Sequence, residues 1–428
     1  MKSEIQEFFR GEVMDDEETL AKYSRDASLL AVRPKVVAYP KDKEDVKNLV
    51  KWVSVNSTRQ DLVHKYGHLS ITARCAGTDM SGGAIGESII LDFTRHMNRL
   101  LGGPLPLHNK SNWEITVEPG MFYRDFEKIT LGKGLILPCY TASKSLNAMG
   151  GMYGNNSAGE RTLKYGKTED YIIESKVIFA DGNEYTVKPL SKKELEDKIA
   201  QGDFEGDVYK NIFNLVKENE EEIEHSKPNV SKNSAGYYIW NVMRARKPEA
   251  GNSAALPSLR GLRHGRNFLL PASLFDLNKL LVGSQGTLGI VTEITFRVVP
   301  NIKYSKLVVI FMKDLSPLGR LVDEILELHP ETLESYDDKT MKLAVRFFFD
   351  FLKNRGIVGM IKFMWSFLPE ALLMWKNGFP KLIILAEFAG ENEEETHRKC
   401  TELVERIKDF KLETHITENQ VEANKYWD

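Results

Sequence analysis

The chain has 428 residues, of which 42% are hydrophobic and 28% are charged, and its formal net charge is −3. This length accommodates two or three domains with a sizeable core, and the composition excludes a disordered or fibrous chain. The nearly balanced charge, without an aromatic and basic recognition motif, argues against nucleic acid as a partner.

The cysteines and the termini bear on compartment and metal content. Cys75, Cys139 and Cys400 are far apart and form no Cys-x-x-Cys pair, so we expect a reducing compartment and no thiolate metal site. The first ten residues lack the apolar core of a secretory signal. The most apolar region, 356–375, is interrupted by charged residues and a proline. We therefore predict a cytoplasmic chain that does not span a membrane and holds no metal.

The N-terminal third predicts a small unit of strands and helices. Residues 1–30 mix helical patterning with an acidic run and are predicted to form an N-terminal arm. Residues 34–40 read as a short strand, and 42–56 have apolar residues at helical spacing. A glycine-rich loop, 74–86, then leads into the apolar strand 88–93.

The loop 74–86 contains four glycines and several small polar residues, so a ligand could approach its backbone and several N–H groups could meet one anion. A structural turn is the competing interpretation. The dinucleotide pattern Gly-x-Gly-x-x-Gly fails, because Ser81 and Met149 stand where the required glycines would be. An NTPase loop ending at Gly166-Lys-Thr168 fails because Arg161 replaces its first glycine. A pyrophosphate cradle of another kind remains.

The middle of the chain repeats the small-residue theme. A predicted strand at 113–120 and a predicted helix at 123–131 precede a second cluster of small residues, 138–159. A third cluster lies far downstream at 282–293. Three separated loops of this kind can line a long, thin ligand from several sides.

After residue 300 the pattern predicts strands at 306–312 and 381–388 and helices at 318–328 and 393–408. The aromatic and apolar stretch 347–375 is interpreted either as buried core or as a surface for a partner or a membrane. The basic stretch 244–266 is predicted to be a long loop, either simply solvated or attracting an anionic substrate or acidic partner.

Three segments resemble the FAD-linked oxidoreductases that share the vanillyl-alcohol-oxidase fold. Arg74–Gly83 resembles their Arg-x-Gly-Gly-Thr-Ser loop, and Gly150–Gly159 resembles their Gly-Gly-x-x-x-Thr-Asn-Ala-Gly-Gly segment. Leu281–Glu293 resembles Leu-x-Gly-Ser-Glu-Gly-Thr-Leu-Gly-Ile-Val-Thr-Glu, with Gln285 in place of glutamate. The greatest similarity is to the group of cytochrome-linked D-lactate dehydrogenase, the glycolate oxidase flavin subunit and D-2-hydroxyglutarate dehydrogenase.

The resemblance implies an α+β chain with a two-subdomain, PCMH-type FAD-binding domain at 31–300, divided into 31–98 and 99–300. An incomplete cap domain would follow at 301–428. It also implies that the cofactor is FAD. The implied cofactor-binding residues are Ala76, Gly77, Thr78, Asp79, Met80, Ser81, Gly82, Pro138, Ser143, Gly150, Gly151, Gly154, Asn155, Ser157, Gly159, Gly166, Ile290 and Val291.

Some positions depart from the family pattern. Members that bind FAD covalently through this loop carry a histidine where this chain has Thr78, so we expect a dissociable, non-covalent flavin. Ala148 and Ala158 replace the usual threonine and glycine. Tyr237 and Arg161 could also face the flavin, but the sequence does not determine their direction.

The implied reaction is the oxidation of a 2-hydroxy acid to the 2-oxo acid by hydride transfer to the flavin. Electrons would pass to an iron–sulfur, cytochrome or quinone acceptor, and an iron–sulfur domain or subunit is an implied partner. We expect the substrate arginine and the catalytic histidines of the family beyond Asp428, so the catalytic residues are unknown. The chain is expected to be cytoplasmic, with peripheral contact at the inner membrane face left open.

Two alternatives remain at this point. The chain could be a non-catalytic FAD-binding subunit or fragment of a larger iron–sulfur flavoprotein complex. It could also belong to a neighbouring branch, such as the sugar-alcohol oxidases or the reductases of peptidoglycan precursor synthesis.

Overall fold

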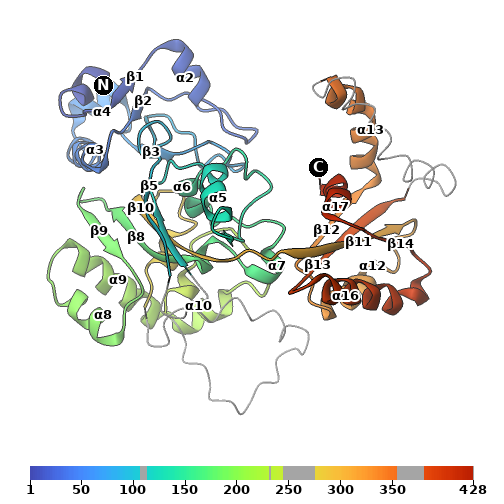
Figure 1. Ribbon diagram of the computed structural model, residues 1–428. Coiled ribbons are helices and arrows are strands. Elements are labelled where there is room, and N and C mark those ends of the chain that lie inside the picture. The colour runs from blue at the N-terminus through green and yellow to red at the C-terminus, as the bar shows by residue number, and fades with distance from the viewer. Residues whose placement is uncertain (107–112, 231–232, 244–274, 354–379, 428) are drawn as a thin grey trace. The chain divides into compact units, whose positions relative to one another are not determined.

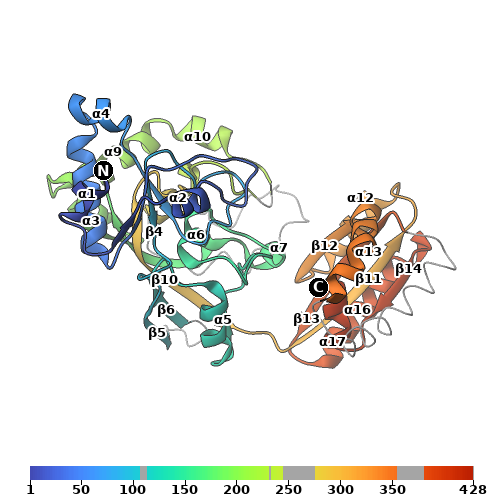
Figure 2. The same cartoon turned by 90° about the horizontal axis from the view of Figure 1, so that it is seen from above.

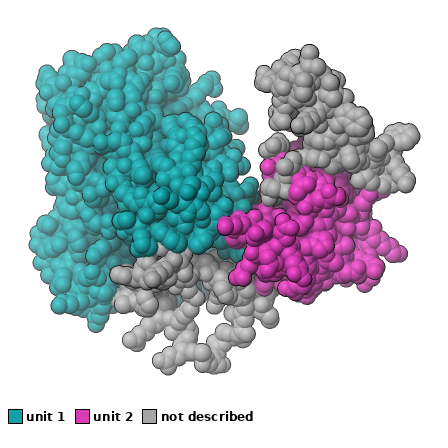
Figure 3. All heavy atoms as spheres, viewed as in Figure 1, with its two compact units in different colours: residues 1–255, 264–301 teal, residues 256–263, 302–428 magenta. Residues whose placement is uncertain are grey.

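The computed structural model describes residues 1–106, 113–230, 233–243, 275–353 and 380–427. The chain divides into two compact units, which Figure 3 colours separately: a first unit of residues 1–255 and 264–301, and a second unit of residues 256–263 and 302–428. Both units combine helices with sheets (Figure 1), so the predicted α+β class is confirmed. All of the basic stretch 244–266 and most of the apolar stretch 347–375 lie outside the described residues.

The N-terminal sheet of the first unit has four strands in the order β1-β2-β4-β3. The strands β2, β4 and β3 run parallel, and β1 is antiparallel to β2. Helix α3 begins where the Asp42 side chain accepts a hydrogen bond from the Glu44 N–H, and its apolar face packs on this sheet. The elements are α1 (Lys2–Gln6), β1 (Glu12–Met14), α2 (Glu17–Tyr23), β2 (Val36–Tyr39), α3 (Lys43–Asn56), α4 (Gln60–Tyr66), β3 (Ile71–Arg74) and β4 (Ile89–Asp92).

The N-terminal residues form part of this core and not a separate arm, which corrects the prediction for residues 1–30. Ile5, Phe9 and Val13 are buried in the same cluster as the α3 side chains. The Asp45 carboxylate, fully buried on α3, accepts hydrogen bonds from the backbone N–H groups of Arg10, Gly11 and Lys41. Figure 2 shows α1 beside α3. The charged residues around Ile5, Phe9 and Val13 gave this segment a mixed pattern, so the sequence did not indicate that these three residues are buried.

The second sheet of the first unit is antiparallel, with the order β5-β6-β10-β8-β9, and β7 also pairs with β10. Strand β10 therefore lies between β6 and β8, although more than a hundred residues separate it from either. The core beneath it contains Tyr123, Phe126 and Phe296. The elements are β5 (Leu100–Pro106), β6 (Trp113–Val117), α5 (Tyr123–Leu131), β7 (Leu135–Ile136), α6 (Met149–Gly154), α7 (Thr162–Tyr165), β8 (Ile172–Ile178), β9 (Glu184–Val187), α8 (Lys192–Ile199), α9 (Phe204–Glu218), α10 (Glu220–Ser226), α11 (Asn278–Leu281) and β10 (Ile290–Pro300); three short 3₁₀ turns are η1 (Thr168–Asp170) and η2 (Ile239–Asn241) here and η5 (Lys408–Phe410) in the second unit.

The second unit holds a four-stranded antiparallel sheet in the order β12-β13-β11-β14. The helices α12 and α16 bury Leu321, Ile325 and Leu403 against β11 and β13. Its elements are β11 (Tyr304–Met312), α12 (Leu318–Glu327), β12 (Thr332–Asp337), α13 (Asp338–Lys353), β13 (Leu382–Gly390), α16 (Glu393–Arg406), β14 (Glu413–Ile416) and α17 (Gln420–Trp427).

The elements predicted from local patterns agree with the structure. The predicted helices at 42–56, 123–131, 318–328 and 393–408 correspond to α3, α5, α12 and α16 within two residues at each end. The predicted strands at 34–40, 113–120, 306–312 and 381–388 correspond to β2, β6, β11 and β13. Among the described residues, no helix has the length and apolar character needed to cross a bilayer.

Candidate functional site

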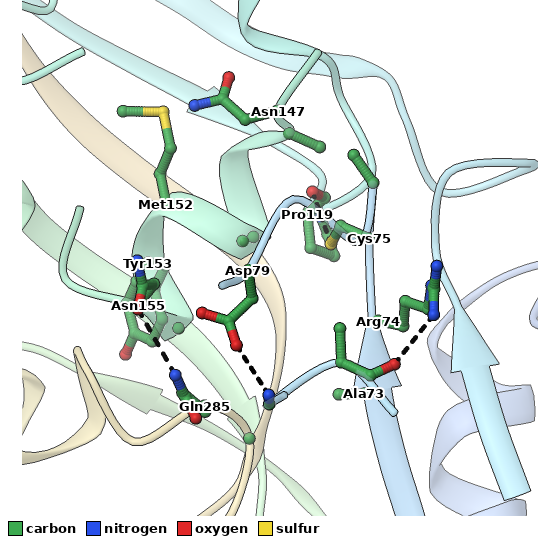
Figure 4. Close-up of a pocket in the computed structure, with 18 of the residues that line it drawn as sticks. Ala73, Arg74, Cys75, Asp79, Pro119, Asn147, Met152, Tyr153, Asn155 and Gln285 are labelled. Atoms are coloured by element: carbon green, nitrogen blue, oxygen red, sulfur yellow. Dashed lines mark hydrogen bonds between the residues drawn. The ribbon is translucent and has the colours of Figure 1, made fainter. Parts of the chain in front are cut away.

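Three glycine-rich segments that are far apart in sequence line one cavity of the first unit (Figure 4). The first follows β3, the second includes helix α6, and the third leads into β10. Each segment therefore starts or ends at a regular element, so the sheets of the first unit hold the three loops together. The cavity has the three-sided lining that the sequence predicts for a long ligand.

The first loop is held from below by Arg74. Its guanidinium donates a hydrogen bond to the Ala84 carbonyl at 3.1 Å and lies 4.9 Å from the centre of the Tyr23 ring. It passes so close under Gly77 that a Cβ there would collide with it. Gly77 and Gly82 have φ of +68° and +89°, which other residues rarely adopt. These glycines allow the loop to turn back over the arginine.

Asp79 closes the far side of the same loop. Its Oδ2 accepts hydrogen bonds from the Gly83 N–H at 2.7 Å, the Ser81 N–H at 3.1 Å and the Ser81 hydroxyl at 2.8 Å. The Asp79 carboxylate thus occupies two backbone N–H groups of the loop, and without it these N–H groups would be available to a bound anion. An incoming phosphate would compete with Asp79 for them.

Gln285 connects the three segments. Its Nε2 lies 3.4 Å from the side-chain Oδ1 of Asn155 (Figure 4). The same nitrogen lies 3.2 Å from the Ser81 hydroxyl, and the Gln285 side chain lies against Gly83. Both contacts need a donor, which a glutamine amide supplies and a glutamate carboxylate lacks. Glutamine in place of the glutamate of the family pattern therefore matches the two neighbouring oxygen atoms, Ser81 Oγ and Asn155 Oδ1, which accept hydrogen bonds from its amide.

The second segment packs closely on the strand end before α5. The Gly150 N–H donates to the Pro119 carbonyl at 2.7 Å, and the Cys75 thiol donates to the same oxygen at 3.4 Å. A Cβ at Gly150 would lie 2.6 Å from the Pro119 Cβ and 3.0 Å from the Cys75 sulfur. At Gly151, in contrast, no atom lies within 4 Å of a built Cβ. Gly150 serves packing, whereas Gly151 leaves the cavity wall flat and open.

A small polar group borders the cavity near Met152. The Asn147 Nδ2 donates to the Thr141 hydroxyl at 2.8 Å, and the hydroxyls of Thr141 and Ser143 are 2.9 Å apart. All three residues line the cavity. Asn147 is 4% exposed, and its Oδ1 has no hydrogen-bond partner among the residues that the structure describes.

A buried ion cluster supports the second segment from behind. The Glu169 carboxylate lies 3.0 Å from the Lys167 Nζ and accepts from the Asn241 amide at 3.0 Å, and its backbone N–H donates to the Asn156 Oδ1 at 3.0 Å. Burial alone would raise the pKa of Glu169, but Lys279 and Lys167 together lower it below its usual value. The glutamate is therefore ionised and joins the segment after α6 to residues 233–243.

Twelve of the residues implied by the resemblance line the cavity, and six do not. Met80 is 82% exposed, and a Cβ at Gly159 would collide with the Tyr140 carbonyl, which gives that glycine a packing role. Tyr237, whose hydroxyl is 2.8 Å from the Thr287 hydroxyl, and Arg161, over the Tyr140 ring, are also outside the lining. The lining residues are Ala76, Gly77, Thr78, Asp79, Ser143, Gly150, Gly151, Gly154, Asn155, Ser157, Ile290 and Val291; the others are Met80, Ser81, Gly82, Pro138, Gly159 and Gly166.

Sequence reasoning missed several residues of the lining, including Thr141, Asn147 and Pro119. Pro119 ends a predicted strand in a Pro-Gly turn and offered no ligand signal. Asn147 has no counterpart in the motifs used for the resemblance. Among these lining residues, only Gln285 could have been singled out from the sequence, because it replaces the glutamate of a family motif.

One pair of histidines in the sequence, His64 and His68, has the His-x-x-x-His spacing of two metal ligands on one helix. Helix α4 ends at Tyr66, so the two are not on the same helix. Within the part of the chain that the structure describes, no group of three or more His, Cys, Asp or Glu side chains is arranged to hold a metal ion.

Comparison with known proteins agrees with this geometry. Residues 34–188 match the family described as FAD binding domain. The chain is 23% identical over 338 residues to D-2-hydroxyglutarate dehydrogenase of Pseudomonas putida, covering 79% of this chain and 30% of that protein. It is 26% identical over 274 residues to glycolate oxidase subunit GlcD of Bacillus subtilis, covering 63% of this chain and 41% of that one.

Among solved structures, alkyldihydroxyacetonephosphate synthase shares the fold, with a TM-score of 0.61 at 16% identity, covering all of this chain and 62% of that one. The chain spans about a third of the length of the D-2-hydroxyglutarate dehydrogenases that it matches over most of its own residues.

Proposed function

Because this chain carries a PCMH-type FAD binding domain, we propose that it is the flavin-binding part of a dehydrogenase that oxidises a 2-hydroxy acid to a 2-oxo acid. The observation that carries the proposal is the cavity of the first unit, which the three glycine segments line. Two of these segments lie within the matched residues 34–188, and the third, around Gly286, lies outside them. Its relatives include proteins named for D-2-hydroxyglutarate, D-lactate and glycolate, which are all 2-hydroxy acids.

The lining fits FAD by its chemistry. The first loop offers backbone N–H groups from Ala76 to Thr78 to the pyrophosphate, and its glycines let the phosphates approach the main chain. The flat wall at Gly151 and the apolar contacts of Ile290 and Val291 suit a planar ring. When bound, FAD supplies the acceptor for the hydride that leaves the carbon bearing the hydroxyl.

The substrate side of the reaction needs groups that this cavity does not offer. A cation must bind the substrate carboxylate, and a base must take the hydroxyl proton. Among the described lining residues there is no histidine, and Arg74 is engaged with Ala84 and Tyr23. This observation favours a second candidate, an FAD-binding subunit or segment whose substrate groups come from elsewhere in a larger assembly, with an iron–sulfur, cytochrome or quinone acceptor.

The test is the absorbance spectrum of the purified chain under anaerobic conditions, with D-2-hydroxyglutarate, D-lactate or glycolate added in turn. Oxidised-flavin bands that bleach with one acid establish the cofactor and the substrate class together. Flavin bands that persist with every acid support the second candidate. A colourless chain that takes up no FAD on reconstitution rejects both.

The same sample tests the mode of attachment. Thr78 has no ring nitrogen with which to bond the flavin, so acid precipitation releases the yellow colour into the supernatant. Colour that stays with the precipitated protein contradicts a non-covalent cofactor.

A further inference from the structure

The first glycine loop carries an acidic residue beside the proposed place of the pyrophosphate. Asp79 lines the cavity and follows directly after Ala76–Thr78, whose backbone N–H groups are offered to the phosphates. In the family motif Arg-x-Gly-Gly-Thr-Ser, a serine stands at the position of Asp79. A negative charge therefore replaces a neutral hydroxyl at the point where an anion is expected to bind.

The Asp79 carboxylate is oriented through one of its two oxygens. The Oδ2 atom accepts hydrogen bonds from the Ser81 N–H, the Ser81 hydroxyl and the Gly83 N–H, at 3.1, 2.8 and 2.7 Å. The Oδ1 atom accepts none from the residues that the structure describes, and it is not among the enclosed polar atoms, so solvent reaches it. Figure 4 shows one carboxylate oxygen on a dashed hydrogen bond and the other turned away from it. Asp79 thus presents one fixed and accessible oxygen at the cavity.

The charges of the lining do not match a bound pyrophosphate. Among the described lining residues, the charged side chains are Arg74 and Asp79, one of each sign. Arg74 is held beneath the loop by the Ala84 carbonyl and the Tyr23 ring. A pyrophosphate brings about two further negative charges to within a few residues of a carboxylate, and like charges this close repel each other. Because the two side chains cancel, the occupied site keeps about two uncompensated negative charges.

We propose that FAD binds to this chain together with a magnesium ion, which is coordinated jointly by Asp79 and the pyrophosphate oxygens. Mg²⁺ takes oxygen ligands and is usually held by one or two carboxylates, by phosphates of the bound nucleotide and by several waters. The Oδ1 atom of Asp79 is the carboxylate ligand, and the charge of the ion equals the charge that the lining leaves uncompensated.

A single carboxylate offers too few ligands to hold Mg²⁺ tightly, so the ion and the cofactor bind cooperatively. Each then raises the affinity of the chain for the other by the same factor. This inference rests on the proposed binding of FAD in the cavity.

The experiment is titration of the apoprotein with FAD in EDTA and in about 5 mM MgCl₂, with sodium chloride added to equalise the ionic strength, so that general screening is the same in both. The natural chain is compared with Asp79→Asn. This variant keeps an oxygen for Ser81 and Gly83 but places an amide nitrogen where Oδ1 stood, and that nitrogen does not bind a cation. Asp207→Asn, on the exposed face of α9, is the matched control.

We expect magnesium to tighten FAD binding roughly tenfold in the natural chain and in Asp207→Asn, and by less than about twofold in Asp79→Asn. In EDTA, Asp79→Asn binds FAD more tightly than the natural chain, because the repulsion between carboxylate and pyrophosphate is gone. Paramagnetic Mn²⁺, which shares the preference for carboxylate and water oxygens, gives a second readout. At equal substoichiometric Mn²⁺, the phosphorus NMR signals of bound FAD broaden strongly in the natural chain and only weakly in Asp79→Asn.

Two results overturn the metal site while leaving the proposed function in place, since FAD still binds in both. The first is a natural chain with the same FAD dissociation constant in EDTA and in magnesium; this measurement needs no variant. The second is a magnesium effect of unchanged size in Asp79→Asn, which places the ion away from this carboxylate. A natural chain that binds FAD in neither buffer removes the cofactor claim itself, and the metal site with it.

Discussion

Replacing Asp79 with asparagine should strengthen FAD binding. The carboxylate stands in a loop whose N–H groups are offered to an anion, and all three of its hydrogen bonds, from Ser81 and Gly83, go to one oxygen, Oδ2. An asparagine retains one such oxygen, so the loop keeps its shape while the negative charge is removed. The substitution therefore separates charge from loop geometry.

The expected size follows from electrostatics. Two unit charges about 4 Å apart interact by about 1 kcal/mol in water-like surroundings, and the pyrophosphate carries about two charges. Asp79 is not fully buried, which keeps the estimate near this lower limit. Removing its charge should stabilise bound FAD by about 1–2 kcal/mol, or roughly five- to thirtyfold in the dissociation constant.

The assay is titration of apoprotein with FAD at about 20 and 300 mM salt. The gain from Asp79→Asn should shrink at the higher salt concentration, because mobile ions screen partly exposed charges. Asp207→Asn on the exposed face of α9 makes the same change in net charge away from the cavity and should leave the affinity unchanged. Weaker binding in Asp79→Asn at both salt concentrations would refute the reasoning and would mean that the carboxylate organises the loop for the cofactor.

Three further changes test packing and ionisation. Asp45→Ala removes the acceptor of three backbone N–H groups and should lower the free energy of unfolding of the first unit by about 2–4 kcal/mol in urea. Gly150→Ala should destabilise the apoprotein by about 1–3 kcal/mol through overpacking, whereas Gly151→Ala should leave its stability unchanged or higher but weaken FAD binding. Burial raises the pKa of Glu184, but hydrogen bonds from Lys43 and Thr292 lower it by a larger amount. The pKa of this carboxyl therefore lies below its usual value. The stability that this ionised glutamate adds is present above about pH 4.5 and is lost as pH falls, so the difference between natural chain and Glu184→Gln should shrink from pH 6 to pH 3.

Each of these expectations has a contrary result. Glu44 lies next to Asp45 in the sequence, and its carboxylate pairs with the partly exposed Lys47, so Glu44→Ala should lower the free energy of unfolding only slightly. An equal loss in both variants would remove the special role of the buried carboxylate. Equal effects of the two glycine substitutions on apoprotein stability would contradict the assignment of packing to one and cofactor approach to the other. A difference between natural chain and Glu184→Gln that stays constant with pH would mean that the glutamate is not ionised in the fold.

Local patterns in the sequence were sufficient to predict several of the regular elements, among them α3, α5, α12 and α16. The apolar residues of α3 recur at helical spacing after the capping Asp42, and this pattern is formed by residues within a few turns of one another. The motifs around Gly77, Gly150 and Gly286 likewise indicated an FAD-binding chain. In each case the information lies in one short segment, so one segment is enough to detect it.

Long-range contacts could not be predicted in this way. Strand β10 pairs with β6 and β8 across more than a hundred residues, and Ile5, Phe9 and Val13 enter the core from a segment whose composition suggested an arm. Gln285 contacts two other loops through a side chain whose direction depends on all three.

The sequence by itself determined several of the helices and strands, the α+β class and the FAD-binding character of this protein, because propensity, periodicity and motif are local. The tertiary structure decided which small residues face the cofactor. Gly151 is open to the cavity and Gly159 is packed against the Tyr140 carbonyl, although the two are equivalent as glycines in one motif. A glycine in the sequence indicates that space is needed beside its backbone. Only the folded chain shows whether a neighbouring segment or a ligand fills that space.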